Sequence, residues 1–413
     1  VAIYFAATVF VYAATAYLLN RASLALAPKL KGAGSNASLG MEANYFATDA
    51  SIRLGYGRIK TGGMETIPPL TSGENNKILH KVLTLVGHEV DSFNAFHFDT
   101  TTIAVGDVGP MAFTSSDGQV LTGSYSGKAN IRAYRGTSTD SADYILANDV
   151  SSAAFGNARA RGIAKLRLSF VFDKDIYKAV PLVNATYQAK RCYDPRLDVS
   201  PGASPTNPSY IAWTQNPELC LIDYLMSVNG GEYPSSEIDW PGVVVAANAC
   251  DGVVNVPGGT QPRYTTNGLL YATEDFQTNV KTMVNAMLGR AMYRDGKWRT
   301  FAGGWQTPTF TIQKADWLTG LSIRFEQGKR KRFNTMRTWY IDPARDWQRV
   351  ESLPRRNATY VAADKGEEIP AETDQMLCTN EYEAQRKGEF LLRQSRNQII
   401  VSGRLPPRMQ NIA

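Results

Sequence analysis

The alternation of apolar and polar positions is most informative in residues 262–343, where it predicts a helix, a hairpin and further strands in close succession. Apolar residues recur at helical spacing from Phe276 to Leu288. Thr273, followed by two acidic residues, supplies a capping hydroxyl and negative charge where the helix dipole favours it. Gly289 then offers the permissive backbone that ends a helix. We therefore expect a buried helix over this stretch.

The next pattern predicts a β-hairpin. Residues 291–294 and 297–301 flank Asp295 and Gly296, a dipeptide that two-residue hairpin turns favour because both central residues take positive φ. Further strands are predicted at residues 308–312, 321–325, 335–341 and 397–402.

The clearest strand pattern lies at residues 164–172, where apolar and polar side chains alternate strictly. One face carries Ala164, Leu166, Leu168, Phe170 and Phe172, and the other carries Lys165, Arg167 and Ser169. We expect one of these faces to be buried.

Capping residues predict three more helices. Asn216 before Pro217 starts a helix through Met226, and Asp239 before Trp240 starts another through residue 249. Near the C-terminus, Asn380 and Glu383 form a capping-box pattern for a helix to about Arg393. Glu383 and Lys387 lie one turn apart on that helix and are predicted to form an ion pair.

The first 19 residues contain no charge and no helix breaker, and they are long enough to cross a bilayer core. Their Ala, Thr and Tyr content also suits a helix buried against other protein. Both interpretations stay open, whereas a cleaved signal peptide is disfavoured because no basic region precedes the run.

Length and composition predict a globular protein of several domains. The chain has 413 residues, 43% hydrophobic and 20% charged, whereas a typical domain holds roughly 150 residues. The order of elements is β-rich, then helical, then β-rich, which predicts a multi-domain α+β fold. We divide it into an apolar N-terminal helix or arm at 1–28, a β-rich domain at 29–180 with a loop-rich insertion at about 105–160, an α+β middle module at 181–300, and a second β-rich domain with a C-terminal helix at 301–413.

No residue set predicts a catalytic, cofactor or metal site. Cys192, Cys220, Cys250 and Cys378 fit neither a zinc pattern nor a dense disulfide framework, so we expect reduced, buried thiols. His80, His88 and His97 are spaced eight and nine residues apart and share no helical face, which favours ordinary structural histidines over metal ligands. No phosphate-binding glycine motif is present.

The strongest charge run is KRKR, formed by Lys329, Arg330, Lys331 and Arg332. The net charge of +6 is small against 44 basic and 38 acidic residues and does not by itself indicate nucleic acid. The run is a candidate for a loop that faces DNA phosphates, and its alternative is a solvated turn between two strands.

A series of motifs in order carries a resemblance to a known family. They are RLGYGRIKTGG at 53–63, SGENNKILHKVLTLVGHEVDSF at 72–93, YDPR at 193–196, NPELCLIDYLMS at 216–227, EIDWPGVVVAANACD at 237–251, the stretch 262–304, RFNTMRTWYIDP at 332–343 and EYEAQRKGEFLL at 381–392. Together they resemble the tail tip attachment or host-specificity protein J family of long-tailed bacteriophages.

The resemblance implies a β-rich baseplate hub with tube-like barrel or sandwich domains at the distal tip of the tail. It also implies a homotrimer in the virion, assembled in the host cytoplasm, that closes or opens the channel for DNA. The implied partners are the distal tail protein and other tail tip proteins, the tape measure protein, DNA in the channel, and the host envelope through residues 1–19. Longer members are expected to continue into fibronectin-like and receptor-binding regions. The alternatives are a tail-associated cell-wall-degrading enzyme and a membrane-anchored bacterial protein.

Overall fold

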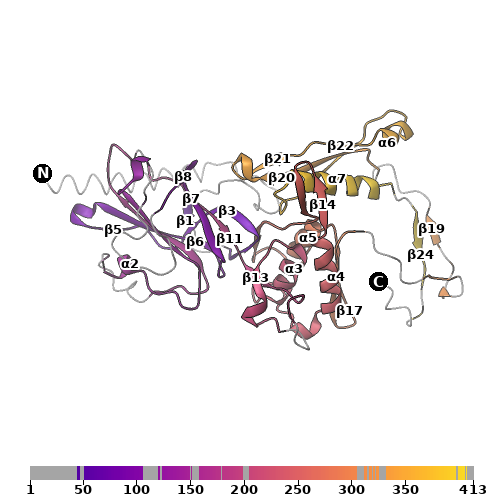
Figure 1. Ribbon diagram of the computed structural model, residues 1–413, viewed down its shortest axis with the longest axis horizontal. Coiled ribbons are helices and arrows are strands. Elements are labelled where there is room, and N and C mark those ends of the chain that lie inside the picture. The colour runs from indigo at the N-terminus through magenta and orange to yellow at the C-terminus, as the bar shows by residue number, and fades with distance from the viewer. Residues whose placement is uncertain are drawn as a thin grey trace.

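The structure is a computed structural model, and its elements lie along one long axis (Figure 1). Sheets occupy one end, helices the middle, and a second strand-rich region the other end. The structure describes residues 44–46, 51–105, 120, 123–148, 150, 158–177, 179–198, 204–304, 311–313, 316–318, 320, 322–324, 332–396, 399–404 and 406. The predicted helix at 1–28 and most of the predicted strand at 308–312 lie outside these residues. None of the described helices is long and apolar enough to cross a membrane.

Two sheets form the first part of the molecule. One contains six strands: β1 (Tyr45–Phe46), β4 (Met64–Glu65), β6 (Ile78–Val86), β10 (Ala164–Val171) and β9 (Ala129–Tyr134) in that order, with β5 (Leu70–Ser72) also paired to β6. The other contains β3 (Arg58–Gly62), β11 (Val183–Gln188), β7 (Ser92–Phe98) and β8 (Thr101–Ile103). Leu83 and Leu166 of the first sheet share a buried core with Phe96 and Tyr187 of the second. The two sheets therefore pack as a sandwich.

Strand β10 is buried on both faces, not on one. Its polar face lies under the segment that leads into helix α2 (Tyr144–Asn148), where Asp143 is also buried. The Nε atom of Arg167 donates to Asp143 over 3.1 Å, and its Nη1 donates to Asn130 over 2.6 Å. The charged side chain can be buried because its donors are met by a carboxylate and an amide.

Three helices form the middle of the molecule: α3 (Pro217–Met226), α4 (Trp240–Cys250) and α5 (Phe276–Ala286). The predicted Asn216 cap of α3 is confirmed, since its side chain accepts from the backbone N–H groups of residues 218 and 219. The predicted Thr273 cap of α5 is wrong. Asp275 caps this helix through the N–H of Thr278, whereas the Thr273 hydroxyl donates to Ser51. Asp275 occupies the cap position because it directly precedes Phe276, the first helical residue.

The predicted hairpin after α5 is confirmed. Strands β17 (Arg290–Arg294) and β18 (Lys297–Phe301) pair across a two-residue turn. Asp295 and Gly296 take φ of 53° and 73°, as a turn with two positive-φ residues requires. Two smaller ribbons stand nearby: β12 (Arg191–Tyr193) with β13 (Ile211–Trp213), and β14 (Val253–Val256) with β15 (Gly259–Pro262).

The first and middle parts of the chain are joined by a strand pair. Strand β2 (Arg53–Tyr56) lies antiparallel to β16 (Gly268–Tyr271), with Leu54 opposite Leu270. Both leucines belong to the buried core that the three helices form. The N-terminal strands are therefore anchored in the helical core by a long-range ladder.

The last part is a four-stranded sheet covered by a helix. Strand β20 (Thr335–Asp342) pairs with β21 (Gln348–Glu351), β22 (Arg355–Arg356) and β23 (Pro370–Asp374). Helix α7 (Glu381–Gln394) packs on β20. Helix α6 (Ala358–Ala363) lies beyond β22, at the upper right of Figure 1. A separate ribbon joins β19 (Ser322–Arg324) to β24 (Ile400–Ser402). Short 3-10 helices occur at Glu74–Asn76, Gly123–Tyr125, Pro208–Tyr210, Ser235–Glu237 and Pro343–Arg345.

The fold is β-rich with a few helices and several sheets, as the sequence predicts. Among the described residues no sheet closes into a barrel. The division into four domains stays a prediction.

Candidate functional site at the 263–267 junction

The predicted DNA-facing run falls mostly outside the described residues, which include Arg332 but not Lys329, Arg330 or Lys331. Arg332 is half-buried. The hydrogen bond from Arg396 is the main cause that lowers the pKa of Asp364 to about 2, and the charge of Arg332 adds to it. At least this arginine is therefore held against the protein. The role of the run in contacting DNA stays a prediction.

The three histidines are separate structural residues. His80 lies between the hydroxyls of Ser72 and Ser169, at 2.7 and 2.8 Å. The Nε2 atom of His88 accepts from the backbone N–H of Gly55 over 2.8 Å, so its Nδ1 carries the proton and donates to the carbonyl of Glu89. Among the described residues no three potential metal-ligating side chains converge.

His97 completes the set. Its ring nitrogens lie 3.0 Å from the hydroxyls of Thr186 and Thr102, and burial lowers its pKa. It therefore bridges strands β11 and β8 across β7.

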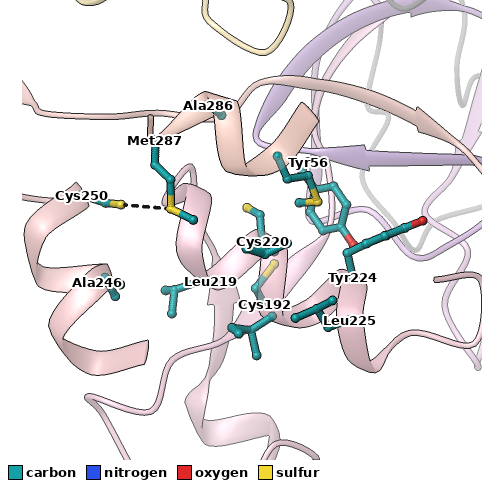
Figure 2. Close-up of a cluster of buried hydrophobic side chains, with 14 of the residues drawn as sticks. Tyr56, Cys192, Leu219, Cys220, Tyr224, Leu225, Ala246, Cys250, Ala286 and Met287 are labelled. Atoms are coloured by element: carbon teal, nitrogen blue, oxygen red, sulfur yellow. Dashed lines mark hydrogen bonds between the residues drawn. The ribbon is translucent and has the colours of Figure 1, made fainter. Parts of the chain in front are cut away.

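The four cysteines are reduced and buried, as predicted. Figure 2 shows Cys192 and Cys220 side by side in the helical core, with Cys250 next to Met287. The hydrogen bond to Cys220, and then burial, raise the pKa of Cys192 well above its ordinary value. Burial likewise raises the pKa of Cys250. The raised pKa keeps the thiols of Cys192 and Cys250 protonated at neutral pH, so these two are packing residues without nucleophilic character.

The segment 263–267, between β15 and β16, lies where the three parts of the molecule meet. Tyr264 binds this segment to the helical middle. Its backbone N–H donates to the carbonyl of Cys250 at the end of α4, and its hydroxyl donates to the carbonyl of Gly303 after β18. Thr266 adds a second contact with the helical middle: its backbone N–H donates over 2.8 Å to the carbonyl of Gln215, just before α3. The segment is therefore tied to both ends of the helical core.

Asn267 joins all three parts through one side chain. Its Oδ1 accepts from the backbone N–H of Arg58 in the sandwich over 2.8 Å and from the side chain of Gln215 over 2.6 Å. Its Nδ2 donates to the hydroxyl of Thr379 before α7 over 2.9 Å. Asn267 is 3% exposed, so water does not compete for these bonds.

A buried ion pair on α7 completes the junction. The Glu383 carboxylate accepts from the N–H and the hydroxyl of Thr265, at 3.0 and 2.7 Å, and lies 2.7 Å from Nζ of Lys387. The neighbouring Arg386 donates over 2.9 Å to the carbonyl of Arg263. The predicted pairing of Glu383 with Lys387 is thus present, but in the interior of the protein.

A second polar link joins the strands to α3. The Tyr56 hydroxyl and Nζ of Lys190 both reach Oδ2 of Asp223 at 2.7 Å. Burial and the Asp223 charge raise the pKa of Tyr56 well above its ordinary value, so the phenol stays protonated and donates. This link holds β2 and the chain after β11 against the same helix.

Glu218 is a buried carboxyl in the first turn of α3. Glu218 is fully buried, and the one described hydrogen bond of its carboxyl group comes from the hydroxyl of Thr300 on β18. Burial raises its pKa to about 8, so it is mostly protonated at neutral pH. It is shielded from solvent and cannot meet a large substrate.

These contacts make the junction a structural site, which holds the sandwich, the helical middle and the last sheet with α7 in a fixed arrangement. Sequence reasoning identified the helices around it and the Asn216 and Asn380 caps, but it missed Asn267, Thr265 and Glu218 as linking residues. No local pattern marks Asn267, because its partners are 209, 52 and 112 residues away. The spacing of Glu383 and Lys387 was a usable signal, but spacing does not report burial.

The comparisons with known proteins show the fold. A chain from the virion of a native gene transfer agent particle aligns over 94% of this chain and 82% of its own length, with a TM-score of 0.62 and 15% sequence identity. A 43 kDa tail protein of prophage MuSo2 from Shewanella oneidensis aligns over 84% of this chain and 78% of its own, with 9% identity and a TM-score of 0.24, which is too low to support a shared fold. No family model and no curated protein matches the sequence.

Proposed function

We propose that this chain is a structural protein of a phage-like tail, and specifically a baseplate hub of the tail tip attachment protein J type. The observation that carries the proposal is the fold it shares, over almost its whole length, with a chain of a gene transfer agent virion. The ordered motifs from residue 53 to residue 392 give independent support for the J type.

The proposed hub is a homotrimer at the distal tip, in contact with the distal tail protein, other tail tip proteins and the tape measure protein. In the described part of the chain, β9 and β8 are the last strands of their sheets, so a tube-like wall would be completed between copies. The buried junction at 263–267 would make each copy move as one rigid unit. Receptor engagement elsewhere would then open the channel for DNA by shifting whole copies against one another.

The proposal includes no catalysis. The hydrolase alternative needs accessible acid and base groups, whereas Glu218, the carboxyl with the most strongly raised pKa among the described residues, is fully buried. Incubating purified protein with peptidoglycan tests this point: release of fragments that depends on one carboxylate would favour the hydrolase. Extraction only by detergent from cells that lack phage would favour the membrane-anchored alternative.

The decisive experiment locates the chain in particles and measures its assembly state. Gold-labelled antibodies against this chain should mark the distal end of tails in purified particles. Sedimentation of the purified protein should give three times the 45.4 kDa chain mass. A monomeric protein that is absent from particles would overturn the proposal.

A further inference from the structure

Helix α7 has one face buried against the sheet and one face open. Ala384, Lys387, Gly388 and Leu392 lie on the buried face. The outer face carries the exposed Phe390 and Arg393 and the half-buried Arg386 and Glu389, whose spacing places them on one side of the helix. Phe390 stands at its centre with 37% of its surface exposed.

Phe390 lines two neighbouring hollows. One lies between α7 and the base of the β17–β18 hairpin, where Leu288, Phe301 and Gly303 line it, and has a volume of about 350 Å³. The other lies between α7 and Arg355 of β22 and has a similar volume of about 350 Å³. We call the two together the Phe390 groove.

The Phe390 groove is strongly basic. Its charged lining residues are Arg290, Arg355, Arg386, Arg393 and Glu389. Four guanidinium groups stand against one carboxylate, so the net charge is positive by three. Each guanidinium has five N–H donors, and the described contacts occupy only some of them: Arg355 donates to Gln385 over 2.5 Å and Arg393 to Glu389 over 2.8 Å. Arg386 is engaged more fully, because it donates to the carbonyls of Arg263 and Pro262 over 2.9 and 3.4 Å.

We propose that the Phe390 groove docks an acidic polypeptide segment of another tail protein, with carboxylates on the arginines and an apolar side chain against Phe390. Arginine pairs with carboxylates through two parallel hydrogen bonds, and a central aromatic residue with a polar rim is the usual form of an interface hot spot. The statement that the partner is a tail protein rests on the proposed function. The groove and its charge are independent of that function.

Two observations favour an acidic segment over other occupants. A site for single-stranded nucleic acid lines up successive aromatic platforms along a basic track, whereas Phe390 is exposed here and Phe301 is half-buried. The stretches 1–43, 305–331 and 397–413 of this chain carry three, five and two basic residues against one, two and no acidic ones. Their positive charge would oppose binding to a basic groove.

The test uses the full chain and a fluorescein-labelled peptide of alternating glutamate and leucine, followed by fluorescence anisotropy. We expect saturable binding that weakens with salt. Phe390→Ala and Arg393→Glu should each weaken the affinity about tenfold. Matched controls are Phe172→Ala, an exposed phenylalanine of the sandwich, and Arg345→Glu, whose side chain is 70% exposed against 72% for Arg393. These controls should bind as the parent does, and melting temperatures should confirm that all four variants fold.

Four results would overturn the proposal: no binding of the peptide, equal weakening by the control variants, equal or tighter binding of oligo(dT), and equal binding of a peptide in which lysines replace the glutamates. Sedimentation without peptide gives a further check, since loss of self-association in Phe390→Ala would assign the groove to a second copy of this chain instead. Binding in solution does not require a particle. A failure here therefore leaves the tail assignment, which antibody labelling tests, unaffected.

Discussion

The Nζ atom of Lys387 lies 2.7 Å from Oε1 of Glu383, and the two side chains are 0% and 1% exposed. Burial lowers the pKa of Lys387, but Glu383, together with Cys378 and Tyr264, outweighs burial and leaves this pKa above its ordinary value. Nζ has no acceptor of good hydrogen-bond geometry in the described part of the chain, so the pair is held mainly by charge attraction. Glu383 is also bound to Thr265, which makes this pair the link between α7 and the junction.

We predict that Lys387→Met destabilises the protein by about 3 kcal/mol, because it leaves an unpaired buried carboxylate. Adding Glu383→Gln should restore part of this loss, since the amide oxygen still accepts from Thr265 and no charge is left unpaired. Urea unfolding of the single and double variants measures both effects. A double variant less stable than Lys387→Met alone would contradict the prediction.

The buried Glu218 predicts a loss of stability as the pH rises from 4.5 toward 8. Its pKa is raised from 4.5 to about 8 in the folded protein, so folding takes up a proton between these values. This contribution is fully present below pH 4.5 and is lost as the pH rises toward 8, with a slope of up to ~1.4 kcal/mol per pH unit.

Glu218→Gln should remove that slope, because the amide can still accept from Thr300 and does not ionise. The variant should therefore be more stable than the parent at pH 8, as measured by urea unfolding across the pH range. The exposed Glu367→Gln is the matched control and should leave the slope unchanged. Equal slopes in the parent and Glu218→Gln would show that Glu218 ionises normally.

His88 predicts a loss of stability on the acid side. Burial lowers its pKa from 6.5 to about 4, so the unfolded chain binds a proton in this window that the folded protein does not. The stability from His88 is therefore present above pH 6.5 and is lost as the pH falls toward 4. We expect His88→Gln to reduce the fall of the melting temperature between pH 6.5 and 4. An unchanged fall would argue against a neutral, buried His88.

Local patterns predicted the elements of the middle of the chain well. The Asn216 cap, the Asp295–Gly296 turn and the Asn380 cap each depend on residues within a few positions, so the chemistry of the segment decides the structure. The sequence also predicted the long strands β10 and β20. It could not show that Arg167 of β10 is buried, because its partner Asp143 comes from a segment 24 residues away.

The junction was beyond sequence reasoning for the same physical reason. Asn267 acts through three partners that only the folded chain brings together, and an asparagine before a strand looks like an ordinary turn residue. The Phe390 groove was missed because Phe390 sits within a regular helical pattern. Local patterns predicted the order of β-rich, helical and β-rich regions, whereas the tube-like domains that the resemblance to tail tip proteins implies stay a prediction, because no sheet of the described residues closes into a barrel.

Gly57 provides the sharpest test of the junction, because it lies where the sandwich approaches segment 263–267. Its φ is +70°, and a Cβ atom there would lie 2.0 Å from the backbone carbonyl oxygen of Thr266. Gly162 is a matched control with φ of +75° and no heavy atom within 4 Å of such a Cβ. Gly162→Ala should cost only the positive-φ strain, about 1 kcal/mol.

Gly57→Ala should cost about 3 kcal/mol or more, because the backbone of Thr266 must move and the neighbouring bonds of Asn267 move with it. Urea unfolding gives the two costs, and limited proteolysis of Gly57→Ala should show earlier cleavage between the sandwich and the helices than in Gly162→Ala. Equal costs for the two variants would mean that the close approach of Gly57 to Thr266 is not needed to hold the parts together. A larger cost for Gly57→Ala together with unchanged proteolysis would place the strain within the sandwich instead of at the junction.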